Sequence, residues 1–164
     1  MTEEARLKRN ADRLKELFPA FAKRLKLVMS DLEKAQLRPR IQDGYRSPAD
    51  QLVAFNSGHS KLKFGFHNVT ASDGTPESLA VDLLDDNKPL SPSTSYLLQL
   101  ARAARRQGLE TGILWGLPAI LQQGVNDAID AQDFQAAVKV GWDPTHIQPT
   151  GITVAQAKSG QRPA

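Results

Sequence analysis

The sequence predicts an α+β fold in which helices pack against a small sheet. Apolar residues recur in steps of four and three over residues 7–32, which is typical of one face of helical structure. Later in the chain, short strand-like runs alternate with turn-rich loops and further helical patterns. With 164 residues and 40% apolar content, the chain is long enough to form one core, and we expect a single domain.

The first part of the chain is expected to form two helices. The apolar stripe consists of Leu7, Ala11, Leu14, Phe18, Phe21, Leu25, Val28 and Leu32. Pro19 interrupts it, and because proline is tolerated in the first turn of a helix but not in its interior, we predict helices over 2–18 and 19–35. The stripe could also be a coiled-coil seam, but a proline within about four heptads favours packing on the domain's own core.

The remaining elements alternate along the chain. Strands are predicted at 37–45, 80–84, 109–115 and 138–148, and helices at 48–56, 92–107, 117–123 and 125–139. Clustered Gly, Asn, Ser and Asp residues predict loops at 56–65 and 68–78. The last residues are rich in Gly, Gln, Lys and Pro, so we expect a domain over 1–150 and a flexible tail at 151–164.

Composition limits the kinds of site and partner. Because the chain has no cysteine, disulfides and thiolate metal sites are excluded, and its three histidines join Asp and Glu as the strong ligands. Residues 1–64 carry fourteen Lys and Arg against eight Asp and Glu, whereas residues 65–164 carry seven against ten. A basic front half suits contact with a polyanion, although a solvated helix surface explains it equally well. The N-terminus lacks the apolar core of a signal peptide and no run of about 18 apolar residues occurs, so we expect no stable membrane insertion.

Four residues form the most informative constellation in the chain: His67, Asp82, Asp143 and His146. Two imidazoles and one carboxylate are a normal ligand set for a catalytic zinc, and a free carboxylate beside a ligand can take a proton from the bound water. Asp82 lies between apolar residues of a predicted strand, where a bare charge is very costly, so it needs a partner or a metal. A salt bridge or a turn is the alternative explanation for Asp82 taken alone.

Six short motifs then occur in an order that resembles one known family. They are Leu17-Phe18-Pro19, Gly44-Tyr45-Arg46-Ser47 with Gln51, Gly58-His59-Ser60-Lys61, His67-Asn68, Ser78-Leu79-Ala80-Val81-Asp82 and Trp142-Asp143-Pro144-Thr145-His146. Over residues 14–149 the chain resembles the zinc peptidases of the D-alanyl-D-alanine carboxypeptidase family, which includes vancomycin-resistance dipeptidases and phage L-alanyl-D-glutamate endopeptidases. The resemblance implies a hedgehog/DD-peptidase-like fold, in which a small antiparallel sheet carries the zinc site.

The resemblance implies that His67, Asp82 and His146 hold the zinc ion. Fourteen residues separate His67 from Asp82, whereas many members of the family have six, so the loop at 69–78 looks inserted. The cost of closing a loop grows only logarithmically with its length, so the ligands can still converge. Asp73 is the alternative ligand at the shorter spacing, but its turn-like context favours Asp82.

The resemblance also implies roles for four polar residues. Asp143 would be the general base, and Arg46 would stabilise the developing oxyanion with a fixed positive charge. Gln51 and Ser60 match polar positions that line the substrate cleft in relatives. Relatives use Glu or Asp as the base, and the phage endopeptidases resemble this chain better there. The stretch 116–140 is longer than in compact relatives and could form a lid or a wall of the cleft.

The ligand set predicts metal-assisted hydrolysis, and the family resemblance implies that the substrates are peptidoglycan stem peptides, cut at an L-alanyl-D-glutamate or a D-alanyl bond. We expect a monomeric phage endolysin or virion-associated lysin, made in the host cytoplasm and reaching the cell wall through a holin or a tail. The alternatives are a cytosolic D-alanyl-D-alanine dipeptidase or carboxypeptidase, and a non-catalytic cell-wall-binding module on the same fold. A nucleic-acid binder is not expected, because it gives no reason for Asp82 or Asp143.

Overall fold

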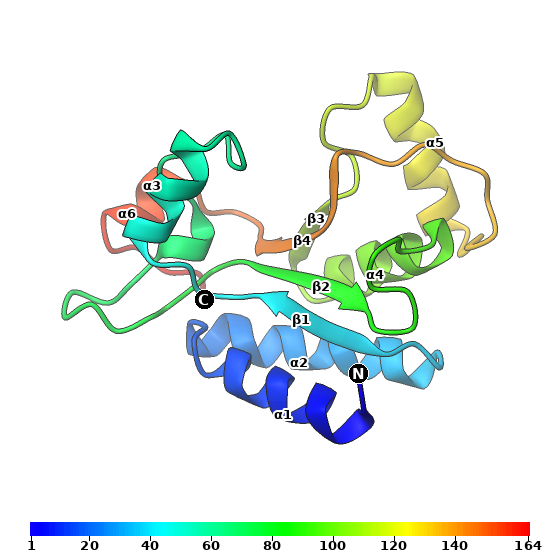
Figure 1. The fold of residues 1–164 in the computed structure, drawn as a ribbon. Coiled ribbons are helices and arrows are strands. Elements are labelled where there is room, and N and C mark those ends of the chain that lie inside the picture. The colour runs from blue at the N-terminus through cyan, green and yellow to red at the C-terminus, as the bar shows by residue number, and fades with distance from the viewer.

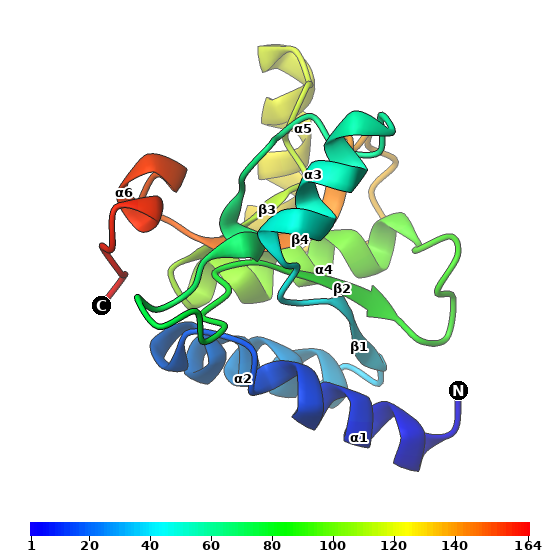
Figure 2. The same ribbon diagram turned by 60° about the vertical axis from the view of Figure 1, so that its left-hand side comes forward.

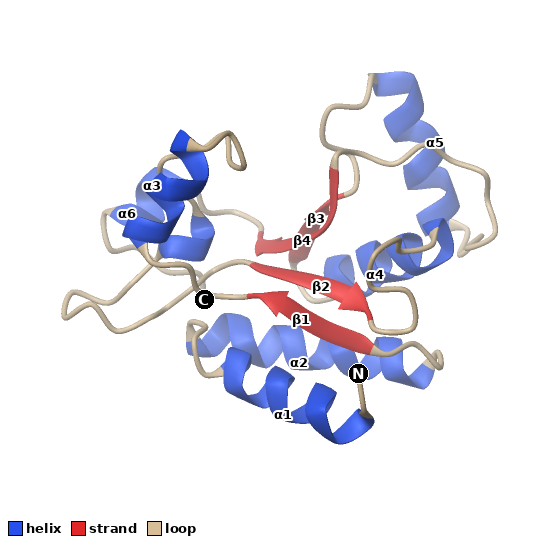
Figure 3. Ribbon diagram, viewed as in Figure 1, coloured by secondary structure: helices blue, strands red, loops and turns tan.

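The computed structural model describes all 164 residues and contains one four-stranded sheet surrounded by helices (Figure 3). Its elements are α1 (Glu3–Leu14), α2 (Pro19–Lys34), β1 (Pro39–Asp43), α3 (Pro48–Asn56), the 3-10 helix η1 (Phe66–Asn68), β2 (Val81–Asp85), α4 (Thr94–Arg106), β3 (Leu109–Gly112), α5 (Ala119–Asp130), β4 (Asp143–Pro149) and α6 (Val154–Lys158). The predicted α+β class is confirmed. None of the helices combines the length and the apolar character needed to span a membrane.

The sheet is antiparallel throughout and has the strand order β1-β2-β4-β3. Its central pair aligns Val81 with Ile147 and Asp82 with His146. Residues directly opposite each other in neighbouring strands point to the same face, and successive residues alternate between faces. The register therefore places Val81 and Ile147 in the core and sends Asp82 and His146 together to the opposite face.

Helices α2 and α4 build the core on one face of the sheet. Leu25 and Val28 of α2 and Leu98 of α4 are fully buried. Tyr96 of α4 is also buried, and its hydroxyl donates to the Leu83 carbonyl at 2.7 Å, which ties the helix to β2. Figures 1 and 2 show α3 and α5 on the side of the molecule opposite α1 and α2. The functional side chains on the other face of the sheet thus rest on a well-packed layer.

Helix α1 departs from the predicted packing, because its buried side chains are polar. Leu7 of the apolar stripe is 50% exposed, whereas Arg6 and Asn10 are buried. Asn10 donates to the Pro39 carbonyl at 2.9 Å and accepts from the Ile41 N–H at 2.8 Å. Helix α1 therefore lies along the edge strand β1 and satisfies backbone groups that an uncovered edge would expose.

The region 117–139 holds one helix instead of the two predicted. Helix α5 runs without a break through Gly124, where a side chain would meet only open space. After the helix, Gln132 adopts a positive φ of 54°, which is incompatible with helical continuation. Alternate residues of the following chain then pack against the core: Phe134, Ala136, Val138 and Val140. The chain turns at 133–136, where the Ala136 N–H donates to the Asp133 carbonyl at 3.2 Å, and continues as irregular chain to Val140. The helix predicted over 125–139 therefore ends at Asp130.

The segment 151–164 also differs from the expected flexible tail, because it contains α6 and contacts the domain. A capping box begins α6. Arg162 donates to the Glu77 carboxylate and to the Thr70 carbonyl, each at 2.7 Å. These contacts attach the end of the chain to the loop at 69–78, and composition alone could not show them.

Candidate metal centre

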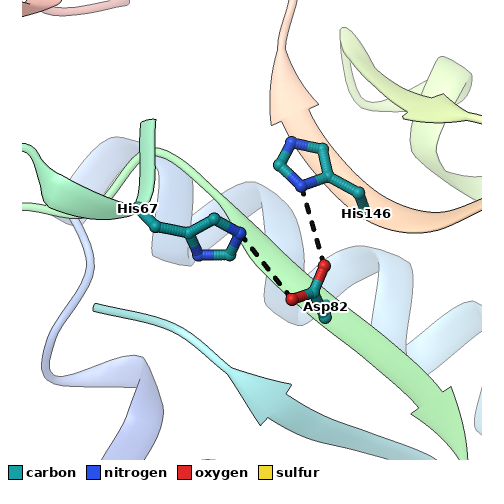
Figure 4. Close-up of side chains that lie close together, drawn as sticks. All are labelled: His67, Asp82 and His146. Carbon is teal, nitrogen blue, oxygen red and sulfur yellow. Dashed lines mark ion pairs between the residues drawn. The ribbon is translucent and has the colours of Figure 1, made fainter. Parts of the chain in front are cut away.

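Three possible metal ligands converge from three elements. Asp82 lies on β2, His146 lies opposite it on β4, and His67 comes from η1. Figure 4 shows the Asp82 carboxylate between the two imidazoles, with Oδ2 at 3.7 Å from His67 Nε2 and Oδ1 at 3.6 Å from His146 Nδ1. One ligand atom from each residue lies within 4.8 Å of the others. These three residues are called the His-Asp-His cluster below.

The long segment between His67 and Asp82 forms a loop whose two ends meet. The Glu77 N–H donates to the Val69 carbonyl at 2.9 Å, so the two ends of the loop lie side by side. Asp73 is exposed in the loop, where its carboxylate accepts from the Thr75 N–H at 2.9 Å. It is not a member of the cluster. The structure thus favours Asp82 over Asp73 as the carboxylate ligand.

Each imidazole has one nitrogen held by the protein and one nitrogen directed at Asp82. His67 Nδ1 lies 2.7 Å from the Gly44 carbonyl, and since a carbonyl only accepts, this nitrogen carries the proton and Nε2 is left with a lone pair. His146 is oriented the other way, with Nε2 at 2.9 Å from Gln148 Oε1 and Nδ1 toward the cluster. Such outer partners are typical of histidines that bind metals.

Burial and neighbouring charges shift the pKa of each group in the site. Burial lowers the pKa of His67, and the charge of Asp82 offsets only part of this effect. Burial also acts to lower the pKa of His146, but the contact with Asp82 and the charge of Asp143 outweigh it and raise this pKa. Burial acts to raise the pKa of Asp82, but the two histidines and Arg46 hold it below its usual range. Burial raises the pKa of Asp143, and the charge of Asp82 adds to the increase. Shifts of this kind concentrate at functional sites.

The cluster lines a cavity of about 660 Å³. Asp143 lines the same cavity, with Oδ2 at 3.8 Å from His146 Nδ1, and Arg46 lines it from the chain before α3. No residue of 116–140 is among the lining residues, so this stretch does not form the expected lid or wall. The aromatic wall instead comes from the flanking residues Trp115 and Trp142, whose ring centroids lie 5.4 Å apart.

The predicted substrate-binding residue Gln51 is a supporting group in the structure. Its side chain is only 3% exposed, and Oε1 accepts from Arg46 Nη1 at 3.2 Å. Nε2 donates to Ser60 Oγ and to the Leu62 carbonyl, each at 2.7 Å. Gln51 and Ser60 both line the cavity, but Gln51 has its hydrogen-bonding groups engaged within the protein. It therefore fixes Arg46 and the loop that carries Ser60.

Several residues that shape the site were not predicted from the sequence. Trp115 packs against His146, with ring centroids 5.2 Å apart, and Gln148 holds the same imidazole. Gly112 is required because a Cβ atom there would overlap the backbone of Asp143, where β3 and β4 approach closely. The position of Gln148, two residues after His146 in a predicted strand, was the one available signal, since alternation puts both side chains on one face.

Comparison with known proteins supports the fold. The structure is similar to the crystal structure of the Serratia marcescens L-Ala D-Glu endopeptidase ChiX, with a TM-score of 0.55 and 22% sequence identity. The similarity covers 87% of this chain and 86% of that chain. No family model and no curated protein sequence matches the chain. The two proteins thus share an α+β fold over most of their lengths.

Proposed function

We propose that the protein is a zinc-dependent peptidase that hydrolyses peptidoglycan stem peptides, at an L-alanyl-D-glutamate or a D-alanyl bond. One observation carries the proposal: the His-Asp-His cluster lines a cavity together with Asp143 and Arg46. The fold shared with an L-Ala D-Glu endopeptidase supports the same chemistry.

The donor set fits a zinc ion. His67 Nε2 and His146 Nδ1 both face the Asp82 carboxylate, and two imidazole nitrogens with one carboxylate oxygen match a catalytic zinc site. The carboxylate is buried enough that an uncompensated charge would be costly, which is a reason for a cation at this point. When bound, zinc would supply a Lewis acid for the substrate carbonyl and would acidify a water molecule.

Asp143 is the group placed to move protons. Its carboxylate is partly buried and lies beside His146, but it is not part of the three-residue cluster, so it is free to act as a base. We assign it the proton of the attacking water, which it then returns to the leaving amine.

Arg46 is the group placed to stabilise negative charge. Its guanidinium is held by Gln51 at 3.2 Å and by Asp43 at 3.5 Å, so it is oriented before substrate binds. A fixed cation of this kind can stabilise the oxyanion that develops on the scissile carbonyl.

The other charges of the cavity suit an acidic peptide. Lys61 lines it together with Arg46, and Lys61 Nζ lies 5.0 Å from the centroid of the Trp142 ring. Lys61 forms no ion pair with an acidic side chain. Stem peptides that contain D-glutamate would bring carboxylates to these cations.

We place this activity in a phage endolysin or a virion-associated lysin that acts on the bacterial cell wall. The resemblance to phage endopeptidases and the basic residues of the first 64 positions support this setting, since positive charge favours approach to an anionic envelope.

The direct test is mass spectrometry of the fragments released from purified peptidoglycan by zinc-loaded protein. Chelator-sensitive release is expected, and the masses of the new termini identify the bond. Intact zinc binding without any release would contradict hydrolysis of peptidoglycan and favour a dipeptidase or a binding module. An assay of D-alanyl-D-alanine hydrolysis would then distinguish these two.

A further inference from the structure

A row of three side chains leads from the cluster to a carboxylate outside the cavity. His146 Nε2 lies 2.9 Å from Gln148 Oε1, and Gln148 Nε2 donates to Glu110 Oε1 at 2.8 Å. Strand geometry explains the row. His146 and Gln148 are alternate residues of β4, and Glu110 of the neighbouring strand β3 lies opposite Gln148. Gln148 lines the cavity, whereas Glu110 does not.

Hydrogen-bond donors and acceptors follow one fixed order along this row. The Glu110 carboxylate can only accept, so it turns the amide NH₂ of Gln148 toward itself. The amide oxygen of Gln148 must then face His146, and because that oxygen also only accepts, the proton of His146 lies on Nε2. In the neutral imidazole that binds a metal, the lone pair of Nδ1 is consequently left on the side of Asp82.

We propose that Glu110 is a positioning residue that acts through Gln148 to fix the tautomer and the orientation of His146 for metal binding. The role rests on the metal-binding part of the proposed function and not on the peptidase activity. The other histidine needs no such device, because the Gly44 carbonyl that holds His67 is backbone and can only accept. A side-chain amide can turn around, so only its second partner decides which end faces His146.

The test compares zinc affinity and the His146 tautomer in a set of variants. Glu110→Met leaves the amide of Gln148 without its directing acceptor, and we expect zinc affinity to fall by roughly 10-fold, at the lower end of outer-shell effects. Nitrogen NMR of metal-free protein, recorded at a pH high enough that His146 is neutral, should show the His146 proton mainly on Nε2 in the wild type and shared with Nδ1 in this variant. Glu4→Met is the matched control, because it removes an equal charge from an exposed residue of α1 and should change neither quantity.

Exchanging the side chains of Glu110 and Gln148 separates the proposed positioning role from a merely structural one. In Gln148→Glu alone, two carboxylates face each other, and zinc binding should weaken or the fold should lose stability. Adding Glu110→Gln restores a donor to the new carboxylate, which can still accept from His146 Nε2. The double variant should therefore recover wild-type zinc affinity and the wild-type tautomer.

Unchanged zinc affinity and an unchanged tautomer in Glu110→Met would overturn the proposal, as would failure of the exchange to restore either quantity in a folded protein. If the wild type binds no zinc, the proposed metal centre fails, but the tautomer comparison in metal-free protein still decides whether Glu110 directs His146.

Discussion

The two histidines of the cluster are held in opposite ways. His67 lies in the short 3-10 helix η1 outside the sheet, and a backbone carbonyl fixes its ring. His146 lies within β4, and two side chains in series fix its ring. The first arrangement depends on how the chain folds around Gly44, and the second depends on residue identity at two further positions. Substitutions of Gln148 or Glu110 should therefore disturb His146 directly. His67 should be disturbed only by changes that move the backbone around Gly44.

The largest expected effect is the loss of either histidine. His67→Ala and His146→Ala each remove one of three ligands, so zinc affinity should fall by more than the roughly 10–100-fold of an outer-shell change. Competition with a chromogenic chelator measures it. His59→Ala is the control, since this exposed histidine contacts Ser57 and is not part of the cluster. Retained affinity in either cluster variant would remove that residue from the ligand set.

Asp143→Ala should separate catalysis from metal binding. Because Asp143 is assigned to proton transfer, turnover should fall by roughly 10²–10⁴-fold while zinc affinity stays near the wild-type value. Turnover is measured by fragment release from peptidoglycan, and affinity by the same chelator competition. Equal zinc loss in Asp143→Ala and His146→Ala would contradict the role of Asp143 as a base.

Gly112→Ala tests the strand contact that supports the His146 side of the site. The new methyl group would overlap the Asp143 backbone, and we expect a loss of about 1–3 kcal/mol in the free energy of unfolding. Urea denaturation measures it. Gly124→Ala is the matched control, because its methyl group meets open space within α5 and should stabilise the protein by about 0.5–1 kcal/mol. Equal effects of the two changes would contradict the close approach of β3 and β4.

The smallest expected effect is that of Asp73→Asn. Asp73 is exposed in the loop and lies outside the cluster, so zinc affinity should not change. Asp82→Asn, tested beside it, should weaken zinc binding strongly because a neutral amide is a poorer ligand than a carboxylate. Zinc loss in the Asp73 variant would restore it as the alternative ligand.

Sequence patterns correctly predicted elements whose limits depend on neighbouring residues. The helix expected at 48–56 has those limits in α3, because Ser47 caps it and Pro48 occupies its first turn. The convergence of His67, Asp82 and His146 also follows the prediction, and the register of β2 and β4 explains two of the three positions. Asp82 carried a signal of its own, since an acid in an apolar strand needs a partner.

Features that depend on pairing between distant segments could not be predicted from one sequence. The polar inner face of α1 is explained only when β1 is known to be the edge strand beside it. Glu110 and Gln148 are separated by 37 intervening residues, and only the register of β3 and β4 brings them together. The buried position of Gln51 likewise follows from the loop that folds over it.

The most direct test of the metal centre is anomalous X-ray diffraction from crystals of the zinc-loaded protein. We predict one strong peak bonded to Nε2 of His67, a carboxylate oxygen of Asp82 and Nδ1 of His146. A peak at another place, or one bonded to Nε2 of His146, would contradict the account of how the two imidazoles are held.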